Sequence, residues 1–195
     1  MKKKIVLCIV LAGLIFSLAG CAEEAGQPEA GVQQENSAVS EEEFAGDGAW
    51  TILVYLCGTD LESGYGAATM DLGEMLDRDF GSQVRFVVQT GGCTQWQNEV
   101  IPEDAIARYE IINGDMQEIS RMEQANMAES ATLKDFVTFG VENYGNNKLG
   151  LIMWDHGGGS VAGVCLDENY GSDTLDLAEI QQALDGITRK FNFIG

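Results

Sequence analysis

Four largely apolar stretches along the chain have the length and composition of buried strands. They are rich in β-branched, aromatic and aliphatic residues, and each of the first three is followed by glycine or polar turn residues. The stretches span residues 50–56, 84–90, 149–153 and 191–195. Because apolar runs without strict alternation are typical of strands covered on both faces, they predict a mostly parallel sheet flanked by helices.

Between these stretches, apolar residues recur at helical spacing. The helical ranges are residues 67–78, 130–144 and 177–187. Ser130 is expected to cap the second helix, and Asp176 with Glu179 forms a capping pair for the third. The alternation of strands and helices predicts βαβ units and an α/β fold.

Two segments depart from this alternation. Residues 108–113 alternate like a half-exposed strand, and Asn113-Gly114 is a hairpin-type turn, so residues 106–122 predict a small antiparallel insertion or edge. Further along, residues 160–166 look β-like, and residues 167–173 form an acidic loop. Three carboxylates in that loop could hold Ca²⁺ through oxygen ligands, but the spacing of an EF-hand is missing, so no metal site is predicted and Ca²⁺ stays an alternative.

The N-terminus has the pattern of a secretory signal. Three lysines precede an apolar run at residues 5–18, which is too short for a stable membrane span. Residues 18–21, LAGC, resemble the bacterial lipobox, in which cleavage before the cysteine is coupled to its lipidation. Residues 1–20 are thus expected to be a lipoprotein signal peptide and Cys21 to carry the lipid; an ordinary signal peptide is the alternative. The expected location is the bacterial cell envelope, anchored to the membrane and extracytoplasmic.

Residues 21–48 are expected to be a disordered acidic tether between this anchor and a domain at residues 49–195. The tether contains eight acidic residues, no Lys or Arg and few large apolar side chains. Of the formal net charge of −20, the signal contributes +3 and the tether −8, which leaves −15 for residues 49–195. Since phosphate neutralisation needs Lys and Arg, we expect no nucleic-acid partner. Such a domain would instead attract basic peptides or cations.

Three cysteines remain in the domain, and none has the spacing of a reactive or metal-binding pair. Cys57, Cys93 and Cys165 are odd in number and lack C-x-x-C spacing, so neither a disulfide framework nor a zinc site is indicated. We interpret each as a small buried side chain.

His156, the only histidine in the chain, follows the third apolar stretch directly through Trp154 and Asp155. A lone histidine is most often a surface or satisfied core residue. Here, however, it precedes the glycines at 157–159, which permit close approach of a substrate and leave peptide N–H groups free to face an oxyanion. Both a structural role and a catalytic or ligand role are therefore open for His156.

The sequence DHGGG at residues 155–159, delivered by an apolar strand, resembles the clostripain family of cysteine peptidases, relatives of caspases, legumains and gingipains. The segment WTILVYLCGTDLES at residues 50–63 is also similar to the first strand and loop of that family. The resemblance implies a caspase-like α/β fold for residues 49–195. It further implies that His156 is the catalytic base, that the Gly157 N–H is an oxyanion contact, and that substrates are peptides with Arg or Lys at P1.

The family pattern also implies a nucleophilic cysteine that the given sequence does not contain. After residues 191–195, FNFIG, the family continues into F-D-x-C within roughly four residues, whereas the sequence ends at Gly195. Cys165 and Cys57 lie in other segments and are poor substitutes. The domain is thus expected to be truncated, the N-terminal portion of a peptidase that is inactive by the family mechanism as it stands.

Two other functions compete with this interpretation. A non-catalytic lipoprotein module would use the same scaffold to bind a basic peptide or small ligand through its acidic face. A dinucleotide-binding fold is disfavoured, because no G-x-G-x-x-G lies between a strand and a helix.

Overall fold

The computed structural model describes residues 48–145 and 147–195. The predicted signal peptide at residues 1–20, the lipidated Cys21 and all but the last residue of the predicted tether at residues 21–48 lie outside this part of the chain. No helix in the described ranges is long and apolar enough to cross a membrane.

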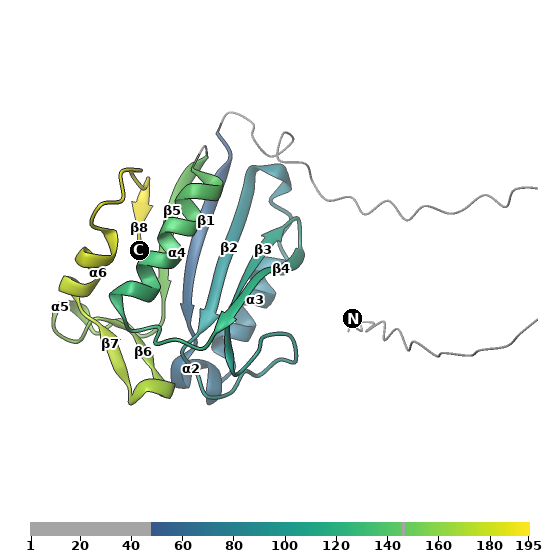
Figure 1. Ribbon diagram of the computed structural model, residues 1–195. Helices are drawn as coiled ribbons and strands as arrows, with labels where there is room; N and C mark the ends of the chain where they lie inside the picture. The colour runs from purple at the N-terminus through teal and green to yellow at the C-terminus, as the bar shows by residue number, and fades with distance from the viewer. Residues whose placement is uncertain (1–47, 146) are drawn as a thin grey trace, which may run out of the picture. The chain divides into compact units, whose positions relative to one another are not determined.

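A six-stranded sheet with the strand order β4-β3-β2-β1-β5-β8 forms the centre of the fold (Figure 1). Its four parallel strands are β1 (Trp50–Cys57), β2 (Val84–Gly91), β5 (Lys148–Trp154) and β8 (Phe193–Ile194). These strands are the four apolar stretches of the sequence. β1 is covered on both faces and almost completely buried, as its continuous apolar run predicts.

The antiparallel part of the sheet is a hairpin at one edge. It consists of β3 (Ala105–Ile112), which pairs with β2, and β4 (Asp115–Glu123). Asn113 and Gly114 connect the strands with φ values of 51° and 79°. Two consecutive positive φ angles are what a two-residue type I′ turn requires, so the Asn-Gly prediction is confirmed.

Helices cover both faces of the sheet. The short helix α2 (Thr59–Ser63) follows β1, and α3 (Ala67–Leu76) packs on one face. On the other face lie α4 (Ser130–Tyr144) and α6 (Leu177–Leu184), side by side (Figure 1). The α4 backbone approaches β1 closely, because a Cβ added at Gly140 would lie 2.3 Å from Cδ1 of Leu53.

Of the two predicted helix starts, one is wrong and the other is confirmed. α4 is preceded by Glu129 as N-cap, so Ser130 is its first helical residue, and the expectation that Ser130 caps the helix is wrong. The chain turns one residue earlier because the carbonyl of Glu129 already accepts the first helical hydrogen bonds. In α6, Asp176 accepts from the Glu179 N–H at 2.8 Å and Glu179 accepts from the Asp176 N–H at 3.0 Å, which confirms the capping pair.

The segment between β5 and α6 contains more short elements than the sequence predicts. It contains α5 (Gly159–Ala162), β6 (Val164–Asp167), the 3₁₀ turn η2 (Glu168–Tyr170) and β7 (Asp173–Leu175). β6 and β7 form a separate two-stranded antiparallel sheet. The prediction of a β-like segment at residues 160–166 is therefore wrong for residues 160–162, which form the last three residues of α5; Gly163 at φ 72° and ψ −146° separates that helix from the strand.

Candidate active site

His156 lies at the edge of the sheet where β1 and β5 both end. The two strands are direct neighbours and run parallel, with Leu56 paired to Trp154. The residues that follow β1, Thr59 and Asp60, therefore meet the residues that follow β5, Asp155 and His156. Open α/β sheets hold their functional groups at this carboxyl edge.

The imidazole of His156 is half-exposed and pairs with one carboxylate. Its Nε2 atom lies 2.9 Å from Oδ1 of Asp60, and the two side chains are 52% and 60% exposed. The hydrogen bond to the imidazole is the main cause that lowers the pKa of the Asp60 carboxyl. The side chain is thus open to solvent, as a residue that meets a substrate must be, and one ring nitrogen is already engaged.

Asp60 was not predicted from the sequence as a site residue. Its only signal was its position in the polar turn after the first apolar stretch. That signal points to His156 only once β1 and β5 are known to be neighbours.

Asp155 connects, through hydrogen bonds, the segment after β5 with the turn after β1 and with β6. Its Oδ1 accepts a hydrogen bond from Oγ1 of Thr59 at 2.9 Å, and its Oδ2 accepts from the N–H of Leu166 in β6. Burial raises the pKa of the Asp155 carboxyl. Thr59 adopts a φ of 48°, a left-handed conformation that is uncommon for a β-branched residue. Such backbone strain is held only where surrounding contacts enforce it.

We expect Asp155→Ala to lower the free energy of unfolding by about 1–3 kcal/mol, because it leaves the Leu166 N–H and the Thr59 hydroxyl without their acceptor. Asp155→Asn keeps one acceptor oxygen at the same place, so its free energy of unfolding should fall by less. Urea denaturation of the three proteins measures the difference. Equal stability of the alanine variant and the parent would show that these hydrogen bonds do not hold the segments together.

The glycines after His156 are not equivalent. Gly158 donates its N–H to the carbonyl of Gly163 at 2.8 Å, so the expectation of free N–H groups is wrong for this residue. Within residues 48–145 and 147–195, no hydrogen bond engages the N–H of Gly157. A Cβ placed at Gly157 would meet nothing within 4 Å. The space beside Gly157 is open to a bound molecule.

The three cysteines of the domain are unpaired and buried, as the sequence interpretation expected. Sγ of Cys57 donates to the carbonyl of Leu166 at 3.3 Å. Burial raises the pKa of the Cys57 thiol well above its ordinary value and that of Cys93 to about 12. Cys165 is completely buried. Because a nucleophile must be an accessible thiolate, none of the three meets that requirement.

The carboxylates of the loop at residues 167–173 are engaged in holding the protein together. Asp167 accepts from the N–H of Met127 at 2.7 Å, and Glu168 accepts from the N–H of Thr94 at 2.9 Å. Across the part of the chain that the structure describes, no three His, Cys, Asp or Glu side chains are grouped to hold a metal ion.

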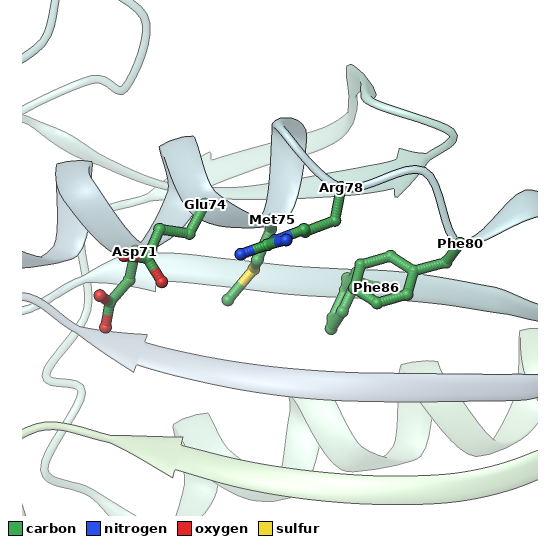
Figure 2. Close-up of a pocket in the computed structure, with 6 residues that line it drawn as sticks. All are labelled: Asp71, Glu74, Met75, Arg78, Phe80 and Phe86. Carbon is green, nitrogen blue, oxygen red and sulfur yellow. The ribbon is translucent and has the colours of Figure 1, made fainter.

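A pocket of about 330 Å³ lies away from the histidine, on the α3 side of the sheet. Figure 2 shows Asp71, Glu74, Met75 and Arg78 in a row along the helix and its C-terminal turn, with Phe80 and Phe86 at the Arg78 end of the row. The pocket includes none of the residues around His156. It is therefore separate from the candidate active site.

Comparison with known proteins gives a consistent family assignment. A family model described as the clostripain family matches residues 54–195. Comparison with curated proteins gave no match.

Solved structures with a similar fold are cysteine proteases. One is a secreted C11 cysteine protease from Bacteroides thetaiotaomicron in complex with an irreversible peptide inhibitor, with a TM-score of 0.57, 19% identity, and coverage of 75% of this chain and 41% of that chain. Another is an inactive zymogen C11 protease from Parabacteroides distasonis, with a TM-score of 0.51, 21% identity, and coverage of 74% and 40%. These likenesses confirm the caspase-like α/β fold. The chain spans about two fifths of the length of these solved relatives.

Proposed function

The chain belongs to the clostripain family, and on that premise we propose that it is the N-terminal part of a cysteine endopeptidase with His156 as catalytic base. The nucleophile is a cysteine beyond Gly195 in the longer protein. The observation that carries this proposal is the parallel pairing of β8 with β5, because it directs the chain after β8 toward the sheet edge that holds His156.

The register of the two strands supports a specific position for the nucleophile. Leu151 pairs with Ile194, an offset of 43 residues, and the N–H of Met153 donates to the carbonyl of Gly195 at 2.9 Å. A chain that continued in this register would bring the fourth position after Gly195 opposite His156. The family resemblance expects its cysteine within roughly the same distance.

The chemistry requires an imidazole beside the thiol. The imidazole takes the thiol proton, and the resulting imidazolium stabilises the thiolate that attacks the peptide carbonyl. Negative charge then develops on the carbonyl oxygen, and we assign the N–H of Gly157 as the donor that stabilises it. The imidazolium returns the proton to the leaving amine.

The charge of the domain supports basic substrates. Residues 49–195 carry a formal charge of −15, which attracts cationic peptides over a range set by ionic strength. Cleavage after Arg or Lys is the specificity that the family resemblance implies. We further propose an extracytoplasmic location with a lipid anchor at Cys21, in keeping with the lipobox-like residues 18–21 and with the secreted proteases among the solved relatives.

The test is to read the gene past Gly195, express the longer chain, and compare hydrolysis of peptides with Arg, Lys or a neutral residue at P1. We expect a cysteine near the fourth following position, and cleavage of the basic peptides that stops on alkylation of that thiol. Absence of a cysteine there, or no preference for basic P1 residues, contradicts the corresponding part of the proposal. Binding of a basic peptide without cleavage would instead favour the non-catalytic module. Metabolic labelling with a fatty acid, lost in Cys21→Ser, tests the anchor.

A further inference from the structure

We propose that Asp60 is a positioning residue for His156: its carboxylate accepts the Nε2–H of the ring and thereby leaves Nδ1 as the nitrogen that takes the proton from the nucleophile. The catalytic part of this inference rests on the proposed function. The part that concerns the imidazole itself rests only on the geometry around His156.

Two carboxylates lie near the ring, and only one is available to it. Asp155, from the end of β5, already accepts from Thr59 and Leu166 through its two side-chain oxygens. Asp60, from the first turn of α2, places Oδ1 2.9 Å from Nε2. Asp60 and Asp155 are carboxyl groups whose pKa values are both affected by His156. Asp60 is therefore the carboxylate that orients the imidazole.

The hydrogen bond determines which nitrogen is the base. A neutral imidazole carries one N–H and one lone pair, and an ionised carboxylate can only accept. The pKa of Asp60 is lowered mainly by its hydrogen bond with His156, so the carboxyl is ionised near neutral pH. The proton must then sit on Nε2, and the lone pair on Nδ1 points elsewhere. When Nδ1 accepts a proton, the same carboxylate stabilises the imidazolium.

The backbone on either side of the Asp60 side chain is held in place by contacts within the turn after β1. Thr59, its neighbour, is completely buried, adopts a positive φ, and is held through Oγ1 by Asp155. The backbone carbonyl of Asp60 accepts the N–H of Gly64 at 2.9 Å. The turn after β1 thus presents the carboxylate to the residue that follows β5.

Because His156 is the only histidine in the 195 residues, nitrogen NMR of its ring reports one tautomer without overlap. In alkaline solution, where the ring is neutral, we expect the parent chain to show the pattern of an Nε2-protonated imidazole. The fraction of that tautomer should fall in Asp60→Asn, which keeps a neutral acceptor, and fall further in Asp60→Ala. Asp115→Asn is the matched control, since this exposed aspartate lies in the β3–β4 hairpin at the opposite end of the sheet, and it should leave the pattern unchanged.

A parent chain with the proton on Nδ1, or a tautomer ratio that is the same in Asp60→Ala, overturns the proposal. Thermal unfolding of each variant checks that the fold is intact. Asp60 is 60% exposed, so its substitution leaves no buried group unpaired in the core.

Kinetics of the longer chain test the catalytic part separately. Asp60→Ala should lower kcat about 10- to 100-fold with KM nearly unchanged, similar to the loss when an outer-shell partner of a metal-bound histidine is removed. Asp60→Asn should recover part of that loss. Unchanged kcat in Asp60→Ala refutes a catalytic role for the contact. If no variant of the longer chain, nor the parent, cleaves peptides, the proposed function fails while the tautomer result still decides whether Asp60 orients His156.

Discussion

Replacement of His156 by alanine is expected to reduce kcat for peptide hydrolysis by the longer chain about 10³-fold or more. Under the proposed function, the variant loses both the base that deprotonates the thiol and the cation that lowers the thiol pKa. KM should change little, because the imidazole acts on the reacting atoms and not on the remainder of the substrate. Steady-state assays with a peptide that has Arg at P1 provide the measurement.

The structure supplies a control for this experiment. The His156 side chain is 52% exposed, and its Nε2 atom pairs with an exposed carboxylate, so the alanine variant should unfold at the same temperature as the parent. A stable variant with no activity assigns the loss to chemistry. A stable variant with full activity would remove His156 from the mechanism and, with it, the proposed function.

The largest effect on stability is expected for Gly163→Ala. Gly163 lies between α5 and β6 at φ 72° and ψ −146°, a conformation available essentially to glycine alone. A Cβ there would also lie 1.9 Å from the carbonyl oxygen of Leu175, a backbone atom of the paired strand β7. We expect the strain and the displacement of β7 together to lower the free energy of unfolding by about 2–5 kcal/mol.

Gly171→Ala is the matched control for that substitution. Gly171 has a φ of 74°, but its ψ of 26° is an ordinary left-handed conformation, and a Cβ there would meet nothing within 4 Å. We expect Gly171→Ala to lower the free energy of unfolding by about 1 kcal/mol. Denaturant unfolding of both variants separates the cost of a positive φ from the cost of the clash. Equal losses would mean that β7 accommodates the methyl group.

Gly163→Ala should also disturb the segment that carries the histidine. The carbonyl of Gly163 accepts the N–H of Gly158, two residues after His156. A shift of the backbone at residue 163 is therefore transmitted to the glycines that follow His156. Nitrogen NMR of the His156 ring in Gly163→Ala would detect that change.

Predictions from local pattern succeeded where one short stretch contains all the information. The capping pair of Asp176 and Glu179 and the turn at Asn113-Gly114 need only residues a few positions apart, and both are present. The capping residue of α4 and the start of β6 were missed. In each case the boundary depends on how the chain enters the packed core, which the local pattern does not contain.

Sequence alone determined the class of fold, the strands that build it, and His156 as the candidate at a strand end. These follow from apolar periodicity and from residue chemistry. Only the tertiary structure decided which strands are neighbours. Many strand orders bury the same apolar runs equally well, so the pattern cannot say that β1 lies beside β5. That adjacency brings Asp60 to His156 across 96 residues of chain and aligns β8 with β5. The partner of the histidine is set by strand order, which is a property of the whole sheet.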